Sequence, residues 1–187
     1  MKEKEYKLII PTRKIYFKLL NIVKILNTYF IYDDCKKIYI DSFYDTKNFD
    51  FLKKKFYLRK RKSILSNNII LTIKELKNTK NNLHIRNSYT NTIPLFEYKY
   101  ISIELKKLIC SITNETNFSK YNLLFQIKQK RIFKYIKYRD LKEPIALLSF
   151  DTIIIYKGKI PNIFLELEIE SIRCNDKELR KIFYSFL

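Results

Sequence analysis

Glycine and histidine each occur only once in the 187-residue sequence, as Gly158 and His84. Loops that bind phosphate through backbone N–H groups, and the turns of dinucleotide-binding folds, need several glycines where the backbone approaches the ligand. A single histidine excludes a multi-histidine metal site and provides no recognisable partner for a catalytic triad. A phosphate group bound by this protein must therefore be held by side chains.

Cysteine is also scarce, with three widely spaced residues that form no Cys-x-x-Cys pair. This count and spacing argue against a disulfide framework and against a zinc site. No signal peptide is recognisable, and the apolar stretch over residues 15–32 is interrupted by Lys18 and Lys24, which makes it too polar to span a bilayer. We therefore expect a cytoplasmic protein that does not associate with membranes.

Positive charge and apolar residues are both abundant. The formal net charge is +19, and apolar residues make up 47% and aromatic residues 16% of the sequence. The apolar content is sufficient for a folded core, and the length suits one domain over residues 1–187. The charge has two interpretations: a polyanionic partner such as a phosphate compound or RNA, or a solvated surface rich in lysine.

Hydrophobic periodicity and turn residues predict a chain that consists mostly of strands. The predicted strands cover residues 3–10, 36–44, 55–63, 68–77, 83–93, 122–138, 147–157 and 162–173. Helices are predicted over residues 13–29, with Thr12 as the capping residue, over residues 99–112, and from residue 176 onward. These elements together predict an α+β fold.

Three of these strands carry charged residues on one face, because side chains alternate along a strand. The three sets are Glu3, Glu5 and Lys7, then Arg59 and Arg61, then Glu166, Glu168 and Glu170. One interpretation is that each charged face meets bulk water. If helices instead pack on the apolar faces, the charged faces line the interior of a closed antiparallel β barrel of about eight strands. In that interior, carboxylates could hold Mg²⁺ or Mn²⁺ and guanidinium groups could hold phosphate.

Several short motifs follow one another along the chain. The segment Glu3–Lys7 has the form Glu-x-Glu-x-Lys, residues 43–46 form an aromatic-Asp-Thr segment, and residues 58–61 read Leu-Arg-x-Arg. Residues 71–74 form a strand that ends in lysine, and Asp151 is followed by a Glu-x-Glu motif at residues 166–168. This order of motifs resembles the CYTH, or triphosphate tunnel metalloenzyme, superfamily over nearly the whole chain. The resemblance implies a barrel with helices packed on its outside.

The resemblance also implies roles for individual residues. Metal binding is implied for Glu3, Glu5, Glu166 and Glu168, with Asp151 as a ligand, as a group that orients a ligand, or as a turn residue. Triphosphate binding is implied for Lys7, Arg59, Arg61, Lys74 and Arg86, and for Lys128, Lys130 and Arg131 in the later basic strand. Alternation favours Lys128 and Lys130 as an interior pair, whereas Arg131 is the only arginine of that segment. The expected catalytic residues are Glu3, Glu5, Lys7 and Glu168, and the segment Tyr44, Asp45, Thr46 is interpreted as chiefly structural.

Two features depart from the pattern of the superfamily. Its central strand commonly reads Arg-x-Glu-x-Glu, whereas this chain keeps Arg86 and has Ser88 and Thr90 in place of the two carboxylates. The number of bound metal ions, one or two, is therefore left open. The stretch between Gly158 and Glu166 is longer than in many members and is expected to contain a loop.

The motifs are those that bind the triphosphate common to several reactions. They do not indicate which chemical group is attached to that triphosphate. We favour metal-dependent hydrolysis of inorganic tripolyphosphate or a nucleoside triphosphate, because the sequence shows no distinct motif for recognising a base. We expect the protein to be a monomer or a homodimer. The resemblance also permits an RNA 5′-triphosphatase, a thiamine triphosphatase or a class IV-type adenylate cyclase. An alternative of another class is a module that binds polyphosphate or nucleic acid and has lost catalysis.

Overall fold

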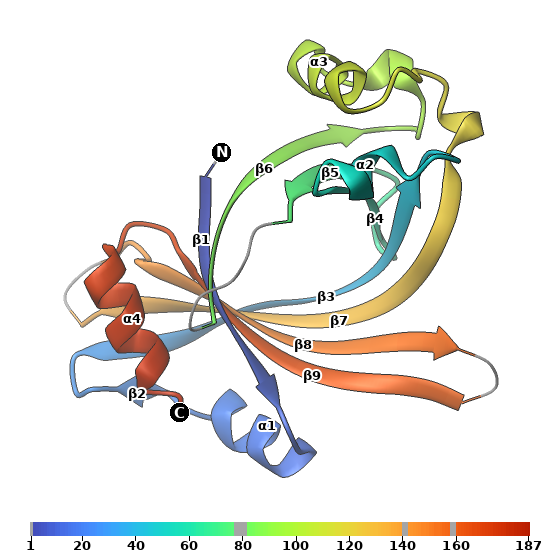
Figure 1. Ribbon diagram of the computed structural model, residues 1–187. Coiled ribbons are helices and arrows are strands. Elements are labelled where there is room, and N and C mark those ends of the chain that lie inside the picture. Colours follow the sequence, from blue (N-terminus) through green and yellow to red (C-terminus); the bar gives the residue numbers. More distant parts are fainter. Residues whose placement is uncertain (1, 77–81, 140–141, 158–159) are drawn as a thin grey trace.

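The computed structural model describes residues 2–76, 82–139, 142–157 and 160–187 (Figure 1). Over these residues the strands are β1 (Lys2–Ile10), β2 (Lys24–Ile25), β3 (Tyr29–Asp45), β4 (Phe56–Ser63), β5 (Ile69–Glu75), β6 (Leu83–Ile93), β7 (Asn122–Tyr138), β8 (Ala146–Lys157) and β9 (Ile160–Ser171). The helices are α1 (Arg13–Leu20), α2 (Asp50–Lys53), α3 (Ile103–Ile112) and α4 (Asp176–Tyr184), with 3₁₀ turns at Tyr98–Tyr100 and Phe118–Lys120.

Eight of the strands form a closed antiparallel barrel, as predicted. The strand order is β2-β3-β4-β5-β6-β1-β9-β8-β7, and β7 also pairs with β3, which closes the sheet on itself. The closing strands β3 and β7 are each 17 residues long and curve around the barrel together (Figure 1). Closure gives every barrel strand two neighbours, so that one face of each strand is directed inward.

Apolar side chains pack on the outside of the barrel in two clusters. One cluster joins the outer faces of β1, β8 and β9 to α1 and α4, with Phe150, Leu167 and Ile182 among its fully buried members. The other joins β4 and β5 to α2 and α3, through residues such as Leu71 and Ile109. Burial of these apolar faces under helices leaves the charged faces of the same strands to line the interior.

The predicted helix over residues 13–29 is too long. Thr12 caps α1 as expected, because its hydroxyl accepts a hydrogen bond from the Ile15 N–H at 3.2 Å, but the helix ends at Leu20. The chain then forms the short strand β2 and turns through Leu26 and Asn27, both of which have positive φ. The following strand accordingly begins at residue 29 instead of 36, since its early residues bury apolar side chains against the first outer cluster.

Two other boundaries also differ from the prediction. The helix expected over residues 99–112 begins at Ile103, where the Ser102 hydroxyl accepts the Leu105 N–H, and residues 98–100 form a 3₁₀ turn. From Ile160 onward the stretch before Glu166 is a strand and not a loop, because β9 begins there and pairs with β8 along its whole length. Gly158 itself lies outside the described residues.

The segment of residues 44–46, at the end of β3, has the structural role predicted for it. The Asp45 carboxylate accepts hydrogen bonds from the backbone N–H groups of Thr46 at 2.8 Å, Phe51 at 3.0 Å and Leu52 at 3.1 Å. Asp45 is 1% exposed, and its three acceptor contacts fix the start of α2. Among the described residues, none of the helices is long and apolar enough to cross a membrane.

Candidate active site

The interior of the barrel contains a cavity of about 290 Å³. Its lining consists of Glu3, Glu5, Lys7, Asp41, Phe43, Tyr57, Arg59, Arg61, Lys74, Arg86, Ile127, Gln129, Arg131, Ile153, Glu166, Glu168 and Glu170. The acidic residues lie mainly on the adjacent strands β1 and β9, whereas the cations lie mainly on β4, β5 and β6. The three charged stripes predicted from sequence therefore converge on one space instead of facing bulk water.

Lys7 lies at the centre of the acidic wall. Its Nζ is 3.2 Å from Glu166 Oε1 and 3.7 Å from Glu5 Oε1, and it forms an ion pair with Glu168. Burial by itself lowers the pKa of Lys7, but the charges of Glu168, Glu5 and Glu166 outweigh burial and raise that pKa. Lys7 is therefore a permanent cation that pairs with these carboxylates.

Arg131 connects β7 to the acidic wall. Its Nε donates to Asp151 Oδ1 at 2.7 Å, and its Nη2 donates to Glu168 Oε2 at 2.6 Å. Burial by itself raises the pKa of Glu168, but Arg131 and then Lys7 outweigh burial and hold that pKa well below its ordinary value. The Glu168 carboxylate is consequently ionised despite its burial, which suits it to bind a cation.

A second group of ion pairs links β1 to β5 and β6. Lys74 Nζ donates to Glu3 Oε2 at 2.6 Å, and Arg86 contacts Glu3 at 3.5 Å as well as pairing with Glu5. Burial raises the pKa of Glu3, but Lys74, the Ser88 hydroxyl and Arg86 together bring it below its ordinary value. Burial followed by the charge of Glu168 raises the pKa of Glu5.

Asp41 is a cavity residue that the sequence analysis missed. Both of its carboxylate oxygens accept hydrogen bonds at 2.7 Å from Arg61, its cross-strand neighbour, and Arg59 Nη1 lies 3.5 Å away. Gln129, which also accepts from Arg61, was missed too. Alternation within the predicted strand 36–44 could have placed Asp41 and Phe43 on one face, but no motif directed attention to that face.

Two neighbouring buried polar atoms on the inward face of the sheet have no hydrogen-bond partner among the described residues. They are Arg59 Nε and Thr72 Oγ1, on residues that are direct neighbours across β4 and β5. Thr72 is 1% exposed and shares the inward face of β5 with Lys74. An unpaired buried donor is costly, so adjacent donors of this kind fit an anion that completes their hydrogen bonds.

Glu170 is the acidic lining residue with the least compensation. In the part of the chain that the structure describes it makes no ion pair, and burial, followed by the charges of Glu3, Glu5 and Glu168, raises its pKa to about 7. Its carboxyl group therefore exchanges a proton near neutral pH. Glu170 was predicted to lie on the acidic face of its strand, without a role of its own.

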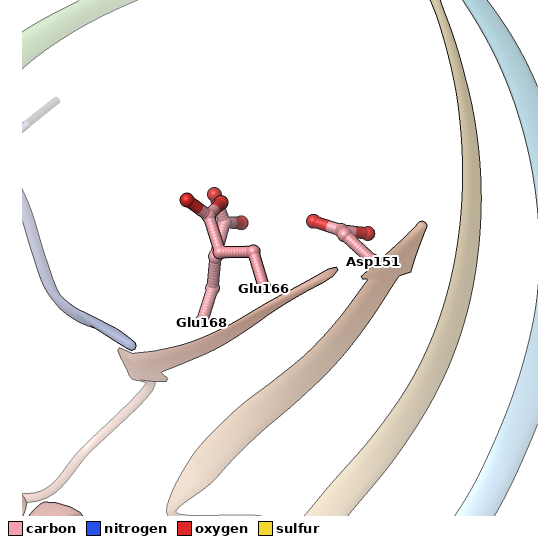
Figure 2. Close-up of side chains that lie close together, drawn as sticks. All are labelled: Asp151, Glu166 and Glu168. Atoms are coloured by element: carbon pink, nitrogen blue, oxygen red, sulfur yellow. The ribbon is translucent and has the colours of Figure 1, made fainter. Parts of the chain in front are cut away.

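Three carboxylates form a compact group that is suited to a metal ion. The carboxylate oxygens of Asp151, Glu166 and Glu168 lie within 4.8 Å of one another, and Figure 2 shows Asp151 directed from β8 toward the two glutamates of β9. Oxygen ligands of this kind match the preference of Mg²⁺ and Mn²⁺. Burial raises the pKa of Glu166 to about 7, so a cation would favour its ionised form. Glu3 and Glu5 line the same cavity outside this group.

The inward placement predicted for Lys128 and Lys130 is wrong. Gln129 and Arg131 line the cavity, so alternation along β7 directs Lys128 and Lys130 to the outside of the barrel. The sequence could not decide the register, because β7 carries cations on both faces. Arg131 is thus the cation that this strand contributes to the interior.

The strand that departs from the superfamily pattern is β6, and it still directs the residues at these positions into the barrel. Arg86 lines the main cavity, and Ser88 and Thr90 follow it on the same face of β6. With Glu3, these two residues line an adjoining cavity of about 340 Å³. The inward face of β6 therefore supplies hydroxyl groups where a strand with the common pattern supplies carboxylates.

A closed eight-stranded antiparallel barrel with facing carboxylates and cations inside it defines a protein of the triphosphate tunnel type. The chain belongs to the CYTH family, whose domain model matches residues 1–186. The sequence matches no curated protein.

Solved structures with the same fold cover almost the whole chain. A candidate adenylyl cyclase of Hippeastrum with a dominant triphosphatase activity has a TM-score of 0.73 at 16% identity, over 99% of this chain and 86% of its own. A candidate adenylate cyclase of Bacillus halodurans has a TM-score of 0.62 at 18% identity, over 99% and 90% of the two chains. The triphosphatase of the Mimivirus capping enzyme has a TM-score of 0.52 at 11% identity, over 99% and 89%.

Proposed function

We propose that the protein is a metal-dependent triphosphatase that hydrolyses a phosphoanhydride bond of a triphosphate bound inside the barrel. The observation that carries this proposal is the juxtaposition of the acidic wall on β1 and β9 with the cations of β4, β5 and β6 around one cavity. Membership of the CYTH family and the fold shared with the Hippeastrum and Mimivirus triphosphatases support it.

The cations would bind and orient the triphosphate. Arg59, Arg61, Lys74 and Arg86 would donate to its oxygens, and guanidinium groups suit this task because they bind phosphate oxygens in pairs. Arg59 Nε and Thr72 Oγ1 are already without partners, so an anion would satisfy them without breaking a contact. Arg61, by contrast, would remain held in place by Asp41.

The carboxylates would serve two purposes. Asp151, Glu166 and Glu168 would hold Mg²⁺ or Mn²⁺, while Glu3 and Glu5 line the same cavity, and the bound ion would offset the negative charge of the phosphates. Glu170 lines the same cavity and makes no ion pair among the described residues, so it would be the carboxylate left free to accept a proton from the attacking water.

A substrate panel tests the proposal. Purified protein is incubated with tripolyphosphate, ATP, thiamine triphosphate and 5′-triphosphate RNA, each with Mg²⁺ or Mn²⁺, and phosphate, pyrophosphate and cyclic AMP are measured. We expect phosphate release that stops on chelation of the metal. In Glu5→Gln and Glu168→Gln we expect a loss of about a hundredfold or more in kcat, whereas Glu97→Gln, on an exposed residue, serves as the control. Near-normal turnover in both cavity variants would refute the assignment, and binding without turnover would favour a binding module.

Hydrolysis at RNA 5′ ends is the second candidate function. The net charge of +19 favours it, because such a charge attracts a polyanion strongly at low salt. The same fold occurs in the Mimivirus capping enzyme triphosphatase. A preference for triphosphate RNA over free ATP that disappears as salt is raised would support this candidate.

The cysteines are all free thiols, which fits the cytoplasmic location we expect for either activity.

A further inference from the structure

One end of the charged cavity has an apolar lining. Five neighbouring strands contribute to this lining. On each of them we start from a polar or charged residue of the cavity and move two residues along the strand toward the β8–β9 hairpin. The inward residue reached in this way is apolar. These residues are Tyr57, Phe43, Ile127, Ile153 and Phe164, on β4, β3, β7, β8 and β9 in order around the barrel. The strands are antiparallel, so all five displacements point to the same end, which we call the apolar mouth.

The registers confirm that the apolar mouth is continuous with the charged interior. Phe43 is the cross-strand neighbour of Arg59, and Ile153 is the neighbour of both Gln129 and Phe164. Phe43, Tyr57, Ile127 and Ile153 line the same cavity as the charged residues. A triphosphate that occupies the charged part would therefore place any group attached to it beside this apolar surface.

Aromatic rings at the apolar mouth are held in place but not covered. Phe43 stacks on Phe125, with ring centroids 4.5 Å apart and planes at 17°, and lies 5.7 Å from the ring of Tyr57. Phe125 is nevertheless 48% exposed and Phe164 is 46% exposed. Exposed aromatic surface at the entrance of a polar cavity offers flat faces on which a heteroaromatic ring can stack.

We propose that the apolar mouth binds the base of a nucleoside 5′-triphosphate, so that nucleotides, and not inorganic tripolyphosphate, are the preferred substrates. The inference rests on the proposed function, and it adds the substrate class. Tripolyphosphate has no apolar part and would leave the mouth exposed to water. A nucleotide fills both regions, with its phosphates among the cations and its base against an aromatic ring at the mouth. Stacking without hydrogen-bond readout predicts little discrimination among the four bases.

The test uses Phe164, which belongs to the mouth, and Phe125, which stacks on the mouth residue Phe43; neither of them lines the charged cavity. In the Phe125→Ala/Phe164→Ala variant we expect kcat/KM for ATP and GTP to fall by about tenfold or more, because stacking on an aromatic side chain contributes that much per base. The same variant should hydrolyse tripolyphosphate within about twofold of the wild-type rate, since that substrate reaches neither ring. Ile163→Ala, next to Phe164 on the opposite face and 45% exposed, is the matched control and should leave both substrates unaffected.

The outcomes separate this inference from the proposed function. Equal effects of the double variant on nucleotides and tripolyphosphate, or no effect on either, would overturn the inference. So would a wild-type protein that hydrolyses tripolyphosphate or thiamine triphosphate but no nucleotide, although triphosphatase activity itself would then stand. A wild-type protein without turnover of any triphosphate would overturn both.

Discussion

Arg131 and Asp151 face each other across β7 and β8 and form a two-pronged ion pair whose carboxylate is completely inaccessible to solvent. A buried charge that loses its partner destabilises a fold strongly. We expect Arg131→Met to lower the free energy of unfolding by about 3 kcal/mol, measured by urea denaturation.

The double variant Arg131→Met/Asp151→Leu is the control for this prediction. It removes both charges, so it should regain much of the stability that the single variant loses, while triphosphate hydrolysis stays low. If the single variant is as stable as the wild-type protein, the ion pair does not compensate the buried charge of Asp151.

Asp45 should matter for stability and not for catalysis, because its three hydrogen bonds all go to the backbone at the start of α2. We expect Asp45→Ala to lower the free energy of unfolding by about 2 kcal/mol, since three buried N–H groups lose their acceptor. The kcat measured well below the melting temperature should be normal. Asp41→Asn provides the contrast: its partner Arg61 lines the cavity, so an unchanged kcat in that variant would contradict our account of the site.

Thr72 provides a test in which stability and binding change in opposite directions. Thr72→Val keeps the shape of the side chain but removes the unpaired hydroxyl, so the ligand-free protein should be as stable as the wild type or more stable. If the hydroxyl donates to a bound phosphate, the affinity for tripolyphosphate should fall by about tenfold, as measured by calorimetry. Thr72→Ser retains the hydroxyl and should bind normally. A Val variant that binds as tightly as the wild type would show that the hydroxyl makes no contact with the ligand.

His84 should make the fold sensitive to acid. Burial, followed by the charges of Lys7 and Arg86, lowers the pKa of His84 to about 4, whereas an unfolded chain takes up this proton near pH 6.5. As the pH falls from about 6.5 to 4, the unfolded state therefore gains a proton that the folded state does not, and stability is lost. His84→Gln cannot titrate and should lose less stability over this interval. Parallel stability curves of the two proteins against pH would rule out this contribution.

Divalent metal should stabilise the fold, because the group formed by Asp151, Glu166 and Glu168 exists only in the folded chain. With Mg²⁺ or Mn²⁺ at about a hundredfold excess over the dissociation constant, we expect a gain of about 2.7 kcal/mol that chelation removes. The gain should be smaller in Glu166→Gln. An equal gain in that variant would place the metal elsewhere.

The sequence was sufficient to predict most of the inward-facing charges. Side chains alternate strictly along a strand, so a motif that shows which way one residue faces also shows which way its neighbours face. Glu3, Glu5 and Lys7 illustrate this, since one matched signature placed all three on the same face. The rule failed at Lys128 and Lys130, where both faces of β7 carry cations and only pairing with β3 and β8 selects Arg131.

Other features depend on contacts between distant segments. The end of α1 at Leu20 was not predictable from periodicity, because Ile22 and Ile25 continue a helical pattern while they pack beside β3 in the first outer cluster. Asp41 was missed because its role arises from Arg61 on the neighbouring strand, and not from any local motif.

The pairing of β3 with β7 brings together residues as far apart in the chain as Tyr29 and Tyr138. Such a contact requires a long intervening segment to be ordered, and topologies rich in distant contacts fold slowly. Without this seam, the sheet would be an open ribbon with two unpaired edges, and its carboxylates and cations would be spread over one solvated face. The capacity to enclose a polyanion should accordingly appear late in folding, when β3 and β7 pair.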